Sequence, residues 1–138
     1  MIDNQILDTT LSPTQCEKAV TDAAAGGTVV FVGTVRNQTR GKKVVSLEFE
    51  SYIPMAKKEM MKIAEQVEQR WSALHVCIHH RVGKLAVGEL PVIIAVATPH
   101  RKAAFEACEY AIDTLKETVP IWKKEVFEDG EVWVAAHP

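Results

Sequence analysis

The sequence predicts an α+β protein in which three helices pack on one mixed β-sheet and paired strands add a small β-rich part. Segments with helical spacing of apolar residues alternate with strand-like runs, in the order α-β-β-α-β-β-α-β-β. The composition agrees, since 138 residues with 47% hydrophobic and 25% charged side chains are enough to form one core. We therefore expect a single domain over residues 1–138.

The first helix is predicted from Pro13 to Ala25. Ser12 is a favourable N-cap, a proline occupies the first helical position and a glutamine the third, and two glycines follow the segment. The β-branched run 28–35 and the alternating run 44–52 predict two strands. Because only the polar, basic segment 37–43 separates them, we expect one hairpin joined by a mobile loop.

Two more helices and four more strands are predicted further along. Apolar residues recur with helical spacing from Pro54 to Trp71, and again in a third helix that has Thr98 as its expected N-cap and ends near Lys116. Strands are predicted at 74–82 and 92–97, and the second is nearly all apolar, as is typical of a central strand covered on both faces. The segment 126–134 predicts a tight hairpin.

Charge and hydropathy exclude several classes of function. The net charge of −2 gives the surface no broad attraction for nucleic acid or an acidic membrane. The N-terminal residues have no basic segment followed by an apolar one, and no apolar run approaches the length of a membrane span. We expect a soluble protein without a targeting signal.

The cysteines and histidines do not predict a metal site. Cys16, Cys77 and Cys108 are far apart in the sequence and include no C-x-x-C pair, so neither a disulfide framework nor a zinc ribbon is expected, and a reducing cytoplasm is the simplest location. Alternation along a strand separates His80 from Cys77 and His79, and no second cluster has ligand spacing.

Three groups of cationic residues are the candidates for a functional site. They are Arg36 with Arg40, Lys42 and Lys43; His100 with Arg101; and Lys116 with Lys123 and Lys124. The helix start beside His100 offers free backbone N–H groups to a phosphate or carboxylate, and Arg101 is unfavourable to the helix dipole there unless it has another role. A lysine near other cations, or desolvated beside Trp122, can act as a base or nucleophile, and a charged one stabilises an oxyanion.

Simpler explanations exist for most of these residues. Arg40, Lys42 and Lys43 are more simply explained as charges that keep a sheet edge soluble, whereas Arg36 follows a strand directly and is better fixed. Lys116 by itself is explained by the helix dipole, which favours a cation in the last turn. Since Lys123 and its neighbour Lys124 alternate along an extended segment, at most one of them faces a given pocket.

Three motifs together resemble the catalytic (large) subunit of molybdopterin synthase. They are Phe31-Val-Gly-Thr-Val-Arg36-Asn37, Thr98-Pro-His-Arg101, and Leu115-Lys116 followed by Pro120-Ile-Trp-Lys123-Lys-Glu125. The resemblance implies an α/β hammerhead fold with an additional β-rich subdomain. It also implies a sulfurtransferase that converts cyclic pyranopterin monophosphate into the dithiolene of molybdopterin. The sulfur would come from the C-terminal thiocarboxylate of a small ubiquitin-like subunit, within a heterotetramer built on a dimer of large subunits, and no cofactor would be needed.

The same resemblance implies roles for individual residues. Lys116 and Lys123 would be catalytic, and Arg36, His100 and Arg101 would bind substrate, the last two across the dimer or within one chain. Phe31, Ile112 and Glu125 would form the pocket for the partner's tail. Ile112 stands where relatives can carry methionine, and the chain ends at Pro138 where relatives often continue, so a pocket contact from a longer tail would be absent or supplied differently.

Two alternatives remain open from the sequence. A non-catalytic module that binds an anion or nucleotide would use the same cations as receptors. A scaffold would use them to dock an acidic partner, in which case association would be sensitive to salt.

Overall fold

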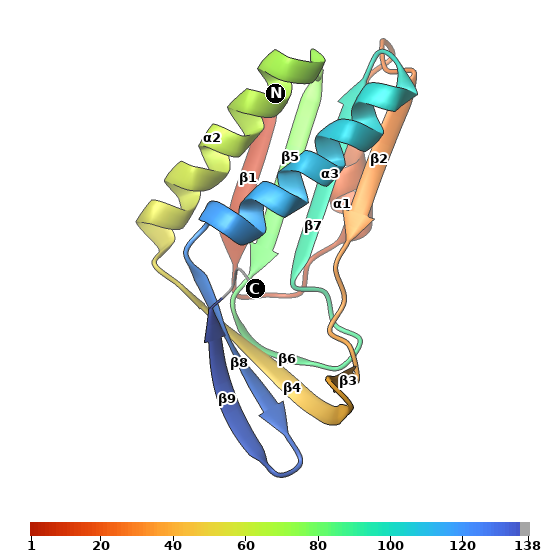
Figure 1. The fold of residues 1–138 in the computed structure, drawn as a ribbon. Helices are drawn as coiled ribbons and strands as arrows, with labels where there is room; N and C mark the ends of the chain where they lie inside the picture. Colours follow the sequence, from red (N-terminus) through yellow and green to blue (C-terminus); the bar gives the residue numbers. More distant parts are fainter. Residues whose placement is uncertain (136–138) are drawn as a thin grey trace.

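The computed structural model describes residues 1–135, so the expected effect of the chain end at Pro138 lies outside the described residues. Its main sheet has the strand order β1 (Ile2–Leu7), β5 (His75–Arg81), β7 (Val92–Thr98) and β2 (Gly27–Val32). Strands β1 and β5 are parallel and the other pairs antiparallel, which confirms the predicted mixed sheet. Helices α2 (Ile53–Trp71) and α3 (Arg101–Thr118) lie side by side on one face (Figure 1).

Strand β7 is the centre of the core. Its alternate side chains Val92, Ile94 and Val96 pack in the cluster under α2 and α3, and Ile93, Ala95 and Ala97 pack in a second cluster with α1 (Pro13–Ala19) on the other face. All seven residues of β7 are buried. The prediction of a central strand covered on both faces is therefore confirmed, and the two faces form two separate apolar clusters.

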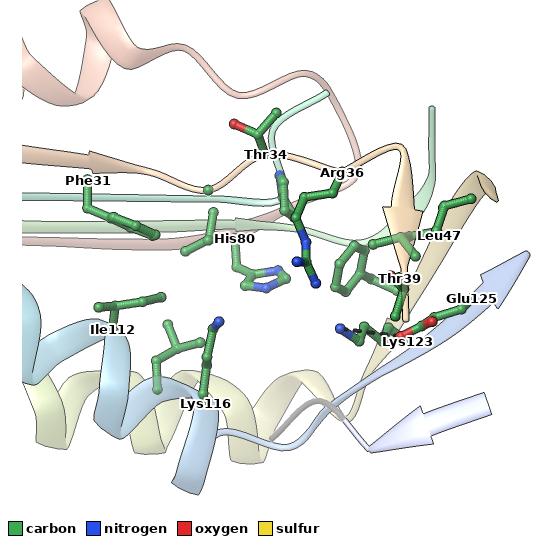
Figure 2. A pocket seen from close by; sticks show the side chains of 16 residues that line it. Phe31, Thr34, Arg36, Thr39, Leu47, His80, Ile112, Lys116, Lys123 and Glu125 are labelled. Atoms are coloured by element: carbon green, nitrogen blue, oxygen red, sulfur yellow. Dashed lines mark ion pairs between the residues drawn. The ribbon is translucent and has the colours of Figure 1, made fainter. Parts of the chain in front are cut away.

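A second sheet, of five strands, forms the predicted β-rich subdomain at one end of the four-stranded main sheet (Figure 1). It contains β3 (Gln38–Thr39), β4 (Lys42–Ser51), β8 (Ile121–Phe127) and β9 (Gly130–Ala135), and β6 (Gly83–Ala86) pairs with β4. The hairpin predicted over 126–134 is confirmed as the β8–β9 turn. Side chains from both sheets meet where the subdomain joins the main sheet (Figure 2).

The predicted hairpin between the runs 28–35 and 44–52 is wrong. Strand β2 pairs with β7 in the main sheet, whereas β4 pairs with β8 and β6 in the second sheet. After β2 ends, Val35 is held by backbone bonds to Glu89 and Gly88, which carry the chain from one sheet to the other. The expected mobile loop is instead the short β3–β4 hairpin, whose turn residues Arg40 and Gly41 both have positive φ.

Three strands were not predicted from the sequence. Strand β1 reads Ile-Asp-Asn-Gln-Ile-Leu, in which three polar residues of low β-propensity hide the strand pattern. It is formed by parallel pairing with β5, from Ile2 opposite Val76 to Leu7 opposite Arg81. The other two, β3 and β6, have only two and four residues, too few to show a period.

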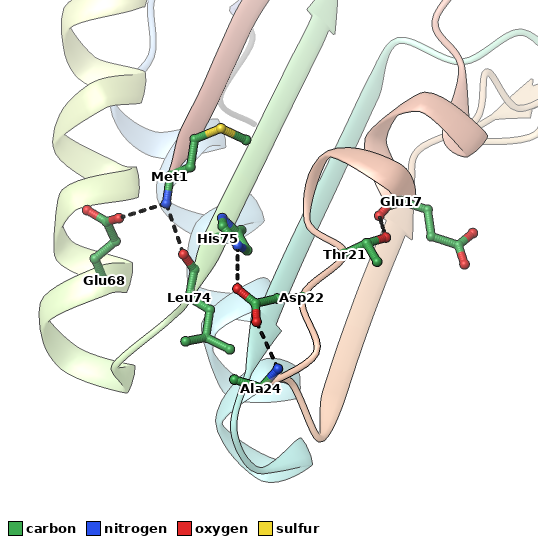
Figure 3. Close-up of polar contacts among 8 residues, drawn as sticks. All are labelled: Met1, Glu17, Thr21, Asp22, Ala24, Glu68, Leu74 and His75. Atoms are coloured by element: carbon green, nitrogen blue, oxygen red, sulfur yellow. Dashed lines mark hydrogen bonds and ion pairs between the residues drawn. The ribbon is translucent and has the colours of Figure 1, made fainter.

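Two predicted helix ends also differ from the structure. Helix α1 stops at Ala19 rather than Ala25, because the Asp22 carboxylate accepts a hydrogen bond from the Ala24 N–H and forms a turn (Figure 3). Helix α3 has His100 rather than Thr98 as its N-cap, because Thr98 is the buried last residue of β7 and donates its hydroxyl to the His100 carbonyl. Helix α2 agrees with its prediction to within one residue at its start.

Gly27, the first residue of β2, allows the backbone of β2 to lie close to the first residue of α3. A Cβ atom at Gly27 would lie 2.5 Å from the Arg101 Cα, which is a backbone atom and cannot rotate away. We expect Gly27→Ala to lower the free energy of unfolding by about 1–3 kcal/mol, as overpacking does. Urea denaturation measures this loss, with Ala23→Ser at an exposed position nearby as the control. An unchanged midpoint for Gly27→Ala would show that the two segments do not need this contact.

Candidate active site

A cavity of about 180 Å³ lies where the β-rich subdomain joins the main sheet (Figure 2). Six of the residues predicted to form a site line this one cavity: Phe31, Arg36, Ile112, Lys116, Lys123 and Glu125. They come from β2 and the segment after it, from the C-terminal half of α3, and from β8. Residues far apart in the sequence are thus brought together by the meeting of these three elements.

Lys123 and Glu125 reach the cavity from the same face of β8. The Lys123 Nζ lies 3.7 Å from the Glu125 Oε1, and Glu125 is only 7% exposed. Lys124 faces the other way and pairs with Glu48 at 3.0 Å and with Glu131 at 3.6 Å. The prediction that only one of the two lysines faces a given pocket is therefore confirmed for this cavity.

Trp122 does not desolvate Lys123 as the sequence suggested. The tryptophan is 42% exposed and does not line the cavity, because it lies one residue before Lys123 on an alternating strand. The walls around the lysine are instead formed by Phe49, Leu47 and the carboxylate of Glu125. The surroundings of Lys123 are consequently partly apolar and partly charged.

Lys116 enters the cavity from the last turn of α3. Figure 2 shows its amino group, the amino group of Lys123 and the guanidinium of Arg36 all pointing into the same space. Among the described residues, Lys116 and Arg36 form no ion pair with a carboxylate, whereas Lys123 has Glu125. Two of the three cations are thus available to an anionic ligand, and the third carries its own counter-ion.

Arg36 is held by the backbone that crosses between the sheets. The preceding residue, Val35, is buried, its N–H donates to the Glu89 carbonyl, and its own carbonyl accepts from the Gly88 N–H. Arg36 therefore projects from a fixed segment, although β2 ends at Val32 and not, as predicted, at the residue directly before Arg36. Its side chain can reach a ligand without the entropy loss of ordering a loop.

A second cavity of about 520 Å³ adjoins the first along the second sheet. Four residues line both cavities: Arg36, Thr39, Lys123 and Glu125. Arg40 and Lys42 line only this outer cavity, and Lys42 also pairs with Asp129 at 3.8 Å on the surface. The two cavities are therefore contiguous, and Lys116 lines only the inner one.

The third predicted group does not belong to this site. His100 is the N-cap of α3 and Arg101 its first residue, whereas Lys116 lies in the last turn of the same helix. With a rise of about 1.5 Å per residue, Arg101 and Lys116 are roughly 22 Å apart along the axis. Neither His100 nor Arg101 lines the cavity of its own chain.

His80 lines the cavity and was missed by the sequence analysis. Burial lowers the pKa of His80 to about 4, so its ring is neutral at physiological pH. Its Nδ1 lies 2.9 Å from the Arg81 carbonyl and donates to it, which leaves Nε2 as an acceptor, and the ring contacts Phe49 edge-on at 5.4 Å. The signal in the sequence was a histidine at an inward position of a buried strand.

The buried His80 makes stability depend on pH. Its pKa is 6.5 when unperturbed and about 4 in the folded protein, so between these values the unfolded chain binds the additional proton. The contribution to stability is complete above pH ~6.5 and is lost as the pH falls through about 4, with a total of about 3 kcal/mol. We expect His80→Gln to flatten this part of the curve of unfolding free energy against pH. Parallel curves for the two proteins would contradict the assignment.

The fold and the cavity define a class: a small α+β protein with a ligand site lined by cations at the junction of two sheets. The family model described as MoaE protein matches residues 6–118. The molybdopterin synthase catalytic subunit of Bacillus subtilis (strain 168) is 47% identical over 130 residues, which are 94% of this chain and 83% of that protein. The chain belongs to the MoaE protein family.

Solved structures agree with this assignment. The crystal structure of molybdopterin synthase from Staphylococcus aureus superposes with a TM-score of 0.89 at 43% identity, covering 94% of each chain. A complex of subunits 1 and 2 of molybdopterin-converting factor from Helicobacter pylori 26695 gives 0.78 at 23% identity, covering 95% of this chain and 89% of that one. The second likeness shows the fold alone. Among residues 1–135, no helix is long and apolar enough to cross a membrane.

Proposed function

We propose that this chain is the catalytic subunit of a molybdopterin synthase. In this reaction, sulfur passes from the C-terminal thiocarboxylate of a small ubiquitin-like subunit to cyclic pyranopterin monophosphate, whose two new sulfurs form the dithiolene of molybdopterin. The observation that carries the proposal is the convergence of Arg36, Lys116 and Lys123 on one cavity in a member of this family.

The charges of the cavity are suited to both reactants. The substrate's phosphate and the partner's thiocarboxylate are anions, and Arg36 and Lys116 have no carboxylate partner among the described residues. We assign substrate binding to Arg36 and place Lys116 beside the incoming thiocarboxylate. Lys123 then stabilises the negative charge that develops during sulfur transfer, or moves a proton, while Glu125 at 3.7 Å orients its amino group.

The outer cavity provides a route for the partner's tail. It lies along the second sheet and shares Arg36, Thr39, Lys123 and Glu125 with the inner one, so an extended peptide entering from the surface would end near Lys116. Phe31 and Ile112 line the inner cavity and would contact that end of the tail. No metal or organic cofactor takes part in this proposal.

The position of His100 and Arg101 supports the proposed dimer. These residues are about 22 Å along α3 from Lys116, so they can bind the same substrate only if they are supplied by a neighbouring large subunit. We therefore place them across the dimer in a heterotetramer with two small subunits. A reducing cytoplasm is the proposed location, and the three free, buried cysteines are consistent with it.

Product formation tests the proposed function directly. The purified chain is mixed with its thiocarboxylated small partner and cyclic pyranopterin monophosphate, and mass spectrometry is used to look for the product carrying two sulfurs. We expect that product with the thiocarboxylated partner and none with the same partner ending in an ordinary carboxylate. No product, from partner and substrate that are competent with another synthase, would contradict the proposal.

Kinetics of an Arg36→Ala variant test whether Arg36 binds the substrate or takes part in the chemical step. We expect Arg36→Ala to raise KM for the pterin substrate about 10- to 100-fold with little change in kcat, because a charge-assisted contact to the phosphate is lost in ground state and transition state alike. Lys43→Ala is the control, since Lys43 is exposed and pairs with Glu128 at 3.2 Å outside the cavities. Steady-state kinetics decide the matter, and an unchanged KM would remove Arg36 from the substrate site.

A further inference from the structure

A second cluster of reactive side chains lies on the opposite face of the main sheet from the cavity. Cys16 from α1 meets Cys77 and His79 from β5, and donor atoms from all three lie within 4.8 Å of one another. Cys16 and Cys77 are fully buried and His79 is 1% exposed. Since His80 faces the cavity, alternation along β5 places these groups on the other side of the sheet, under α1.

The histidine is oriented by a carboxylate. The His79 Nε2 lies 3.2 Å from the Asp3 Oδ2, and the His79 Nδ1 lies 3.3 Å from the Cys16 Sγ. When Nε2–H donates to Asp3, the lone pair of Nδ1 points toward the two sulfurs. The same Asp3 oxygen is 3.9 Å from the Cys77 Sγ. A carboxylate on the far nitrogen of a histidine is the arrangement that supports histidine ligands of metals.

We propose that Cys16, Cys77 and His79 bind a zinc ion, with Asp3 as the positioning residue for His79. Zinc takes thiolate sulfur at about 2.3 Å and imidazole nitrogen at about 2.0–2.1 Å in a tetrahedron, whose edges are then roughly 3.3–3.8 Å. The present separations, none above 4.8 Å, require only a small contraction to reach this geometry. Water completes the fourth position, and the two-sulfur, one-nitrogen donor set favours zinc over magnesium or calcium.

The protons balance when zinc enters. The thiol protons of Cys16 and Cys77 leave for solvent as the two Zn–S bonds form. Any proton on the His79 Nδ1 leaves in the same way, and no group is oxidised or reduced.

The surrounding structure pre-organises the cluster. Asp22 and His75, 2.8 Å apart, tie the turn after α1 to the start of β5 (Figure 3). This contact helps to hold α1, and with it Cys16, against the sheet. The Asp3 side chain, 3.2 Å from His79, is 25% exposed, so this side of the cluster lies close to solvent. A bound ion would join the seven-residue helix α1 to the main sheet, so its role would be structural and separate from sulfur transfer.

Cobalt provides the spectroscopic test, since Co²⁺ replaces zinc in such sites and thiolate ligands give it an intense charge-transfer band. The reduced, metal-free protein is titrated with Co²⁺, and zinc is then added as competitor. We expect a single Co²⁺ per chain, the thiolate band, its loss on adding zinc, and a higher Tm with zinc present. Cys16→Ser and Cys77→Ser should each abolish the band, and Asp3→Asn should weaken zinc binding about 10- to 100-fold.

Cys108→Ser is the matched control, because Cys108 is a buried cysteine of α3 whose thiol donates to the Ile94 carbonyl, and this variant should keep the band. X-ray absorption of the zinc-loaded wild-type protein needs no variant and should show two sulfur ligands. Absence of stoichiometric binding would overturn the proposal, and so would a band that survives both cysteine substitutions or a Cys16–Cys77 disulfide as the stable state under reducing conditions. None of these measurements uses synthase activity, so they stand apart from the proposed function.

Discussion

Replacing Lys123 by alanine is expected to reduce kcat about 10²- to 10⁴-fold, the range typical of a lost general acid–base or charge-stabilising group. The Lys123 amino group is the cation that the protein pairs with its own buried carboxylate, Glu125, at 3.7 Å. Such a pair fixes the amino group in place before substrate arrives. Single-turnover sulfur transfer from the thiocarboxylated partner, followed by mass spectrometry, measures the loss.

Binding must be measured beside turnover in the Lys123→Ala protein. If the chain is an enzyme, substrate binding is largely retained while the two-sulfur product disappears. If it is a non-catalytic anion-binding module, binding weakens in proportion to any activity. Lys124→Ala is the matched control, because Lys124 is the next residue on β8 and points away from the cavity to Glu48 and Glu131. Equal losses in the two variants would show that the effect is structural.

Lys116→Ala is expected to lower kcat/KM for the thiocarboxylated partner about 100-fold, the second largest effect. Lys116 has no carboxylate partner among the described residues and points into the space shared with Arg36 and Lys123 (Figure 2). Removing it leaves the partner's terminal anion without its cation in the inner cavity, and a lost charged hydrogen bond costs about 1.5–3 kcal/mol. Kinetics at varied partner concentration, with the pterin substrate saturating, isolate this step.

Measurements of stability separate the proposed binding role of Lys116 from its simpler role in stabilising the helix dipole. A lysine in the last turn of a helix stabilises it by about 0.3–1 kcal/mol through the dipole, so Lys116→Ala will also shift urea denaturation slightly. Lys62→Ala, at an exposed position of α2 where it pairs with Glu59 at 3.2 Å, should change stability by a similar amount and leave kinetics unaltered. Unchanged kcat/KM in the Lys116 variant would leave only the dipole role.

Elements with strong local patterns were predictable. Helices α2 and α3 have long apolar stripes, and β7 is a continuous apolar run, so period and composition alone placed them to within a few residues. Strand β1 was not predictable, because its three polar residues take strand geometry only when β5, more than 70 residues later, offers its edge. Pairing of that kind leaves no local trace in the sequence.

Some residues of the candidate site were likewise predictable from the sequence, and others were not. Motifs placed Arg36, Lys116 and Lys123 among the candidate site residues, and the structure brings them to one cavity. His80 was missed, because only the meeting of the two sheets turns a buried strand histidine into part of a cavity wall. The sequence also indicated no further metal-binding donor beside Cys77 and His79, because Cys16 precedes them by about 60 residues and comes close only when α1 packs on the sheet.

The sequence by itself determined the α+β class, the central buried strand and the hairpin at 126–134, because each depends on the period and composition of single segments, and its motifs supplied the candidate cations. Only the tertiary structure decided which strands pair, that His100 and Arg101 lie at the far end of α3 from the cavity, and that two cysteines and a histidine meet under α1. The physical reason is that long-range pairing depends on burial and hydrogen bonding summed over whole faces, and no short window of sequence contains that sum.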